Sequence, residues 1–255
     1  MNVEIWSDVV CPWCYIGKRR FELALARFAH RDGVNVVYRS FQLDPGASSA
    51  ESEPVLQHLA RKYGTTVEQA AAMMGRVEGV AAEIGLEYHL DRTLSGNTLD
   101  AHRVLHLARE RGREAAVLEH FYRAYFTEGH SLFDTPALVR LGAAAGLDPA
   151  EVQTVLESDA YAADVRADIE EARALGVQGV PFFVVDERYA ISGAQPEELL
   201  SRALTQAWAE SHPLTAFPAG PAAAGDPGLA DGDVCADGCC DAPAAAGAGP
   251  EGGRR

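Results

Sequence analysis

The sequence predicts an α/β fold in which a βαβ unit at the start of the chain and a ββα unit near residues 180–210 enclose a long segment of helices. Two observations support this fold class. Runs rich in β-branched and aromatic residues, typical of strands, fall before residue 45 and after residue 180. Between them, apolar residues recur at helical spacing, and Gly, Pro and Asp separate one such segment from the next.

The first unit begins with an apolar run at residues 3–6, which predicts a buried strand. Apolar residues at helical spacing then predict a helix over residues 12–30. We expect this helix to end at Gly33, because glycine readily adopts the left-handed conformation that follows many helices. Residues 34–41 predict a second strand, parallel to the first and joined to it by a right-handed crossover.

Residues 54–175 show only helical patterns. Asp134 and Asp148 each stand shortly before a proline, an arrangement typical of a helix start, and we expect Asn97 to cap another helix. The helices predicted here cover residues 55–63, 67–84, 98–111, 114–127 and 160–175, and two more begin at Asp134 and Asp148.

The β pattern returns near residue 180. Residues 182–185 form an apolar run that predicts a strand, and residues 189–192 follow as its hairpin partner. A final amphipathic helix is predicted from residue 193 to about residue 208. This order of elements is the one expected for a thioredoxin-like fold that carries a large all-helical insertion.

We therefore expect one thioredoxin-like domain in two parts, residues 1–44 and 176–211, interrupted by a helical insertion domain at residues 45–175. In residues 212–255, Ala, Gly and Pro dominate and large apolar residues are almost absent, so this segment cannot bury a core and is predicted to be a flexible tail. The tail contains Cys235, Cys239 and Cys240.

The charge and composition of the chain exclude some classes of binding partner. The net charge of −15 argues against nucleic acid and anionic membranes. No stretch resembles a membrane span of about 20 apolar residues, and the chain leads straight into its first strand without a signal-peptide pattern, so we expect a cytoplasmic protein. Five cysteines are too few for a framework of structural disulfides, which suggests that these cysteines take part in a reaction instead.

Residues 11–14 (CPWC) lie where the first predicted strand turns into the first predicted helix. Unpaired N–H groups and the positive dipole end of a helix stabilise a thiolate, so we expect Cys11 to be the reactive thiol. The alternative is half of a zinc site, but such a site needs a second Cys or His pair nearby, and the next cysteine is Cys235. The strand before the motif and the helix after it favour a redox function.

Several segments resemble the DsbA-family thiol-disulfide oxidoreductases, and in particular their cytoplasmic FrnE-like branch. The resemblance covers about residues 1–209. The segments that carry it are residues 11–14 (CPWC), 95–103 (SGNTLDAHR), 179–184 (GVPFFV) and 191–195 (ISGAQ).

The resemblance implies that Pro181 lies next to Cys11, with a cis peptide bond after Val180. The backbone of Val180 would then be free to pair with an extended substrate beside the disulfide. Without the resemblance, Pro181 is equally well explained as the start of a strand.

Roles can be assigned to the residues around the motif. Cys11 is expected to be the nucleophile that forms a mixed disulfide with the substrate, and Cys14 is expected to resolve it. Pro12 and Trp13 would tune the thiolate. Asp8 either relays a proton to or from Cys14 or is a polar strand end that caps the helix, and the sequence leaves both open.

Two histidines, His102 and His106, stand four residues apart on one predicted helix, a spacing compatible with a metal. No third ligand is evident in the sequence. We therefore expect a solvated or cleft-lining pair rather than a metal site.

These patterns predict a thiol-disulfide oxidoreductase or isomerase that acts on protein thiols or disulfides without a bound cofactor, with small thiols as alternative partners. The alternative is a glutathione-dependent transferase or isomerase of the kappa-class and 2-hydroxychromene-2-carboxylate isomerase type. Those enzymes share the fold but typically have Ser where this chain has Cys11. A non-enzymatic metal-binding or scaffold protein would leave the CPWC motif unexplained.

The tail cysteines have three interpretations: an auxiliary dithiol, in which Cys235 pairs with Cys239 or Cys240 and exchanges with the CPWC pair, a soft-metal site, or incidental thiols. A flexible chain of ~40 residues spans roughly 30–40 Å, enough to reach the motif. If the dithiol exists, truncation after Ala209 slows the reduction and reoxidation of a substrate disulfide. An unchanged rate contradicts the relay, and zinc that co-purifies only with the full-length chain supports the metal site instead.

Overall fold

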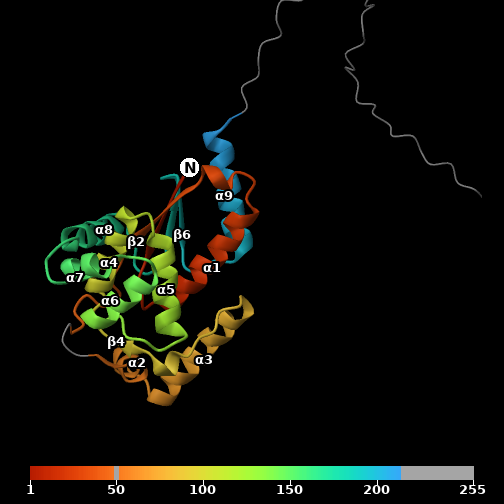
Figure 1. Cartoon of the computed structure of the whole chain (residues 1–255). Coiled ribbons are helices and arrows are strands. Elements are labelled where there is room, and N and C mark those ends of the chain that lie inside the picture. Colours follow the sequence, from red (N-terminus) through yellow and green to blue (C-terminus); the bar gives the residue numbers. More distant parts are fainter. Residues whose placement is uncertain (49–51, 214–255) are drawn as a thin grey trace, which may run out of the picture. The chain divides into compact units, whose positions relative to one another are not determined.

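Strand β1 (Asn2–Ser7) lies inside a four-stranded mixed sheet whose strand order is β2-β1-β5-β6. It pairs in parallel with β2 (Asn35–Ser40) and antiparallel with β5 (Phe182–Val185), which forms a hairpin with β6 (Tyr189–Ser192). The computed structural model describes residues 1–48 and 52–213. The predicted βαβ and ββα units thus join in one thioredoxin-like sheet (Figure 1).

Helices surround this sheet (Figure 1). Helices α1 (Pro12–Arg27) and α9 (Glu197–Ser211) belong to the thioredoxin-like part and pack against each other. The helices between β2 and β5 are α2 (Val55–Tyr63), α3 (Val67–Glu83), α4 (Leu99–Glu110), α5 (Glu114–Phe126), α6 (Thr135–Ala144), α7 (Pro149–Leu156) and α8 (Ala162–Ala174). None of the helices in residues 1–48 and 52–213 is long and apolar enough to cross a lipid bilayer.

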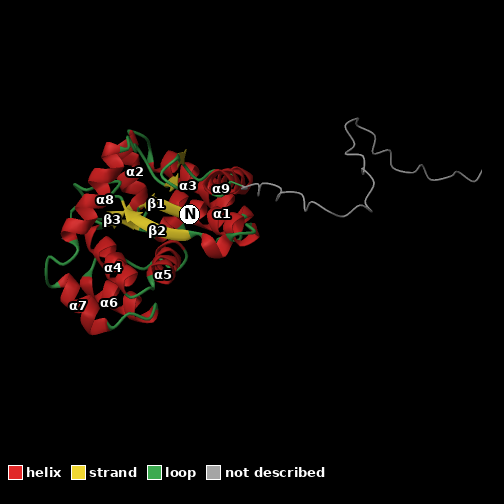
Figure 2. Ribbon diagram, turned by 90° about the horizontal axis from the view of Figure 1, so that it is seen from above, coloured by secondary structure: helices red, strands yellow, loops and turns green. Residues whose placement is uncertain are grey.

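The two faces of β1 meet different helices, because successive side chains of a strand point to opposite sides. Val3 and Ile5 belong to the main core, which also includes buried residues of α1 and α9. Trp6 faces α8 instead, and its indole Nε1 donates a hydrogen bond to the carbonyl of Asp168 at 2.9 Å. Figure 2 shows the sheet between α1 and α9 on one side and α8 on the other.

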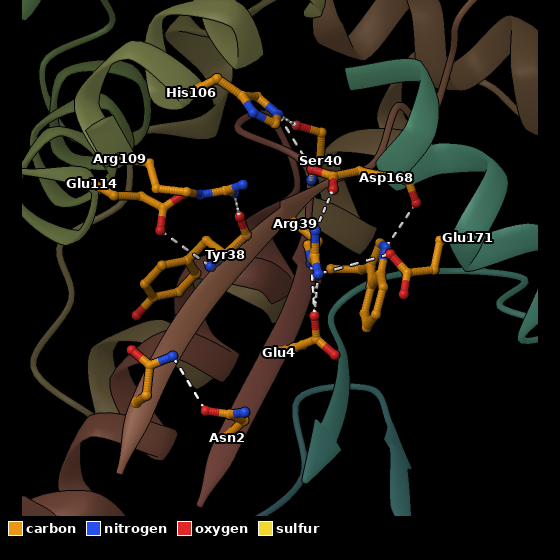
Figure 3. Close-up of polar contacts among 12 residues, drawn as sticks. Asn2, Glu4, Tyr38, Arg39, Ser40, His106, Arg109, Glu114, Asp168 and Glu171 are labelled. Carbon is orange, nitrogen blue, oxygen red and sulfur yellow. Dashed lines mark hydrogen bonds and ion pairs between the residues drawn. The ribbon is translucent and has the colours of Figure 1, made fainter. Parts of the chain in front are cut away.

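The outer edge of β2 is capped by charged side chains from the helical insertion rather than by another strand (Figure 3). The N–H of Tyr38 donates to Glu114 Oε2 at 3.3 Å, and Arg109 donates to the carbonyl of Tyr38. The N–H of Ser40 donates to Asp168 Oδ2 at 2.9 Å. Helices α4, α5 and α8 are therefore tied to the sheet through backbone groups of β2.

Asp168 is the centre of this network (Figure 3). Its carboxylate also lies 3.0 Å from Arg39 Nη1 and 3.2 Å from His106 Nε2, and Arg39 Nε in turn donates to Glu4 at 2.8 Å. Burial alone would raise the pKa of Asp168, but the hydrogen bonds from His106 and Ser40 and the charge of Arg39 lower it below its usual value.

Two local predictions need correction. Helix α1 ends at Arg27 rather than near residue 30, and Gly33 closes a short 3-10 turn without a left-handed conformation. A Cβ at Gly33 would lie 2.7 Å from the Trp208 ring, so close packing of α9 explains the glycine. The insertion is also not purely helical, because the two-residue strands β3 (Glu53–Pro54) and β4 (Leu94–Ser95) pair antiparallel.

The network predicts that Asp168→Ala lowers the free energy of unfolding by about 1–3 kcal/mol, since it leaves the Ser40 N–H without its buried acceptor, whereas Arg39 keeps its contact with Glu4. Urea unfolding measures this loss. Because the folded-state pKa of Asp168 is lowered, its contribution is present at neutral pH and is lost as the pH falls below about 4.

Glu171→Ala is the matched control for this substitution. Glu171 is 46 % exposed and lies 3.9 Å from Arg39, so its removal should cost no more than about 1 kcal/mol. Equal losses for the two variants would contradict the central role of Asp168.

Candidate functional site

The two cysteines of the CPWC motif lie at the start of α1, directly after the turn that follows β1. Cys11 is the residue that precedes the helix, and its N–H donates to the carbonyl of Asp8 at 3.1 Å. The N–H of Cys14 donates to the carbonyl of Cys11 at 2.9 Å. Both thiols are free, and the residues are only 4 % and 2 % exposed.

The loop that leads into β5 lies against Cys11. The Cys11 thiol donates to the carbonyl of Val180 at 3.5 Å, although the two residues are 169 positions apart in the sequence. The peptide bond between Val180 and Pro181 is cis, as the resemblance implied. The pairing of β1 with β5 places this loop, because Trp6 lies opposite Phe182.

Gly17 permits this close approach, and the sequence analysis did not identify it. A Cβ at Gly17 would lie 2.8 Å from Pro181 Cγ and 3.4 Å from Phe183 Cζ. Both distances are shorter than an ordinary van der Waals contact or at its limit, so a larger residue in this turn of α1 would displace Pro181. A glycine inside a predicted helix was the one signal in the sequence.

The thiol of Cys14 is held in its protonated form. Burial raises its pKa above the usual value, and the neighbouring Cys11 raises it further through a hydrogen bond and its charge. The backbone N–H of Asp8 lowers the pKa of Cys14, whereas the charge of the Asp8 carboxylate raises it. The two cysteines therefore differ: Cys11 touches the Val180 carbonyl, and Cys14 lies inside a buried cluster with Asp8.

Asp8 is 1 % exposed, and the hydrogen bonds of its carboxylate are made with residues outside α1. Its Oδ2 accepts the N–H of Leu43 at 2.8 Å, and its Oδ1 lies 3.2 Å from His102 Nε2. Of the two roles open for Asp8, the cap is therefore wrong, and the proton relay stays a prediction.

The interpretation of His102 and His106 as a solvated or cleft-lining pair is also wrong. Both histidines are buried, and each pairs with an aspartate: His102 with Asp8 and His106 with Asp168. His106 Nε2 also lies 3.1 Å from Ser40 Oγ at the end of β2, so this side chain points from α4 toward the sheet. Among residues 1–48 and 52–213, no cluster of three or more His, Cys, Asp or Glu is placed to hold a metal ion.

The helical insertion also contacts the motif directly. Tyr88 donates its hydroxyl to the carbonyl of Pro12 at 2.8 Å. Tyr15 donates to Glu119 at 2.7 Å, and its ring stacks on Tyr122 with centroids 4.9 Å apart. The sequence patterns assigned no role to these aromatic residues, and their relation to the motif is visible only in the fold.

The other predicted residues are placed as follows. Trp13 is 41 % exposed beside the thiols. The N-cap residue of α4 is Thr98 rather than Asn97, but Asn97 Oδ1 accepts the N–H of Leu99, the first residue of the helix, at 2.9 Å. Cys235, Cys239 and Cys240 lie outside the described residues.

Comparison with known proteins adds two sequence relationships. The family model described as a DSBA-like thioredoxin domain matches residues 2–205. The uncharacterized protein YwbO of Bacillus subtilis (strain 168) is 24 % identical over 209 residues, which span 80 % of this chain and 96 % of that protein.

Several solved structures are similar. A probable DsbA oxidoreductase from Streptomyces coelicolor is 54 % identical, with a TM-score of 0.80 over 86 % of this chain and 94 % of that one. Two more distant structures share the fold. A 2-hydroxychromene-2-carboxylate isomerase is 16 % identical (TM-score 0.59; 83 % and 98 % covered). The cytosolic disulfide reductase DsbM from Pseudomonas aeruginosa with GSH is 20 % identical (TM-score 0.55; 81 % and 98 % covered).

The contact between Gly17 and Pro181 predicts that Gly17→Ala lowers the free energy of unfolding by about 1–3 kcal/mol, because the added methyl group overpacks the site. Since Pro181 and Val180 would move together, we also expect slower reaction of Cys11 with an added disulfide. Chemical unfolding and the rate of thiol release measure the two effects.

Gly79→Ala is the control, because a Cβ there meets nothing within 4 Å and α3 should gain about 1 kcal/mol from the loss of an interior glycine. A Gly17→Ala chain as stable and as reactive as the unaltered one would show that the contact is unimportant.

Proposed function

The chain belongs to the DSBA-like thioredoxin family, and from this premise we propose that it exchanges disulfides with protein thiols through Cys11 and Cys14. A thiolate of the substrate attacks the Cys11 sulfur of the Cys11–Cys14 disulfide and releases Cys14. The second substrate thiol then breaks the mixed disulfide, so the substrate is oxidised and the cysteine pair is reduced. The same steps in reverse reduce a substrate disulfide.

The observation that carries this proposal is the asymmetry of the two thiols. Cys11 lies at the N-terminal end of α1, where helix N–H groups favour a thiolate, and 3.5 Å from the Val180 carbonyl at the loop edge. Burial and the neighbouring thiol raise the pKa of Cys14. Cys11 is therefore suited to meet the substrate, and Cys14 to react only after a mixed disulfide has formed. Pro12 and Trp13, between them, are proposed to tune the thiolate.

The Val180–Pro181 loop supports an extended polypeptide as the substrate. We propose that the backbone of Val180 pairs with a substrate strand that lies beside Cys11. Trp13, which is 41 % exposed, offers an apolar surface next to the thiols for side chains of an unfolded chain. In this scheme Asp8, buried beside Cys14, accepts and returns the Cys14 proton.

A glutathione-dependent reaction is the second candidate. It is favoured by the shared fold of the 2-hydroxychromene-2-carboxylate isomerase and of DsbM, whose structure was solved with GSH. The paired thiols favour disulfide exchange over an isomerase that needs a single group at the position of Cys11. We further propose the cytoplasm as the compartment, as for the cytosolic DsbM.

Trapping the intermediate tests the proposal. Reduced Cys14→Ser protein, mixed with an unfolded protein that contains a disulfide, is expected to form a stable mixed disulfide through Cys11, because no second thiol resolves it. Mass spectrometry identifies the adduct, and a dithiol reductant should release it. The tail cysteines are replaced by Ser in this background, so that they form no adducts of their own.

Cys11→Ser is the matched control and should form much less adduct, since Cys14 is buried and its pKa is raised. Equal trapping by both variants would reverse or abolish the assigned roles. Adducts with glutathione but not with unfolded protein would favour the second candidate.

A further inference from the structure

Helix α4 carries two buried histidines one turn apart, and each lies beside an aspartate, although His106 Nε2 also lies 3.1 Å from Ser40 Oγ. His102 Nε2 lies 3.2 Å from Asp8 Oδ1, and His106 Nε2 lies 3.2 Å from Asp168 Oδ2. No side chain of the four is more than 7 % exposed. Since the two pairs are chemically alike, any difference in their roles has to come from the surroundings of each aspartate.

Asp168 stabilises the edge strand of the sheet. Its carboxylate accepts the N–H of Ser40 and binds Arg39, so it fixes the outer edge of β2 (Figure 3). None of these contacts involves a thiol. The pair of His106 and Asp168 is therefore structural.

Asp8 lies next to the thiol pair, since its carbonyl accepts the N–H of Cys11 at 3.1 Å. Its backbone N–H and its carboxylate both act on the pKa of Cys14, in opposite directions. One carboxylate oxygen is held by the N–H of Leu43, and the other faces His102. Among the residues that the structure describes, His102 is the one side chain that lies within hydrogen-bond distance of the Asp8 carboxylate.

The other titratable groups around Asp8 come from four segments. Cys11 and Cys14 face it from α1, and Tyr122 from α5 donates its hydroxyl to the Asp8 carbonyl at 3.4 Å. Asp8 also borders a cavity of about 80 Å³, a volume that can hold water. The titratable groups that line this cavity with Asp8 are Asp44, His58, Lys62 and Tyr125.

We propose that His102 is a positioning residue for disulfide exchange: by donating its Nε2 proton to Oδ1, it holds the Asp8 carboxylate in place to accept the proton of Cys14. This inference rests on the proposed function, because it concerns the step in which Cys14 attacks the mixed disulfide. A hydrogen bond to the charged form of a buried carboxylate favours that form.

The step balances as follows. The Cys14 proton moves to the Asp8 carboxylate, the Cys14 sulfur bonds to the Cys11 sulfur, and the bond between Cys11 and the substrate sulfur breaks. The substrate leaves as a thiolate, and the proton passes from Asp8 to that thiolate or to water in the cavity. The cysteine pair is oxidised to a disulfide while the substrate disulfide is reduced to two thiols.

An aromatic disulfide, dithiobis(nitrobenzoate), separates this step from the first one. Reduced full-length protein, with Cys235→Ser, Cys239→Ser and Cys240→Ser so that only two thiols react, should release thionitrobenzoate in two phases. The first phase reports the attack by Cys11, and the second reports the attack by Cys14 on the mixed disulfide. Stopped-flow absorbance over a range of pH gives both rates.

His102→Leu should slow the second phase about tenfold near neutral pH and leave the first phase unchanged. The second phase should recover as the pH rises, because an unpaired buried carboxylate has a raised pKa and is ionised only at higher pH. His102→Gln should restore the rate, since the amide N–H can donate to Asp8 without titrating. Asp8→Asn should remain slow over the pH range in which His102→Leu recovers.

His106→Leu is the matched control: it removes an equivalent buried pair and should lower stability without changing the second phase. A folded His102→Leu chain with a normal second phase at every pH overturns the inference, and so does an equal slowing by His106→Leu. If His102→Leu does not fold, a normal second phase in Asp8→Asn also overturns the inference. Wild-type protein that forms no Cys11–Cys14 disulfide refutes the proposed function as well.

Discussion

The antiparallel pairing of β1 with β5 is the interaction on which the candidate site depends. Ile5 lies opposite Phe183 and Trp6 opposite Phe182, so one register assigns side chains to both faces of the sheet. The same register fixes where the chain leaves each strand, and hence which carbonyl meets the Cys11 sulfur. A slip of β5 by one residue would turn the buried Phe183 to the face of the sheet on which Trp6 lies. The core packing that holds the sheet therefore also holds Val180 beside Cys11.

The parts of the molecule that the sequence predicted are those that local patterns determine. The strand before Cys11, the helix after it and the apolar strand at residues 182–185 follow from spacing and composition, and the structure has all three. Contacts between residues far apart in the chain produce weaker patterns in the sequence. Gly17 is a glycine because of Pro181, far away in the sequence, and the partner of His102 lies 94 residues earlier, at Asp8. A polar residue at helical spacing usually faces solvent, which is why this histidine was misplaced.

The helical insertion contributes to the site in two ways. It supplies polar partners to groups that the thioredoxin-like part leaves buried, such as His102 for Asp8 and Glu114 for the Tyr38 N–H. It also packs aromatic rings against the start of α1, where Tyr88 reaches the Pro12 carbonyl. Buried charges are costly unless they are paired. The stability of the sheet and the stability of the insertion therefore depend on each other, although the insertion interrupts the thioredoxin-like part in the sequence.

The capped edge of β2 has a consequence for any attempt to reduce this protein to its minimal redox domain. Joining β2 directly to β5 would retain the sheet, both thiols and Pro181, but it would expose the N–H groups of Tyr38 and Ser40 on an open strand edge. Open edges recruit strands from other molecules. Such a shortened chain would self-associate through β2 and aggregate. The groups that cover this edge of the sheet are a short row of carboxylates and a guanidinium, contributed by helices that form no part of the sheet.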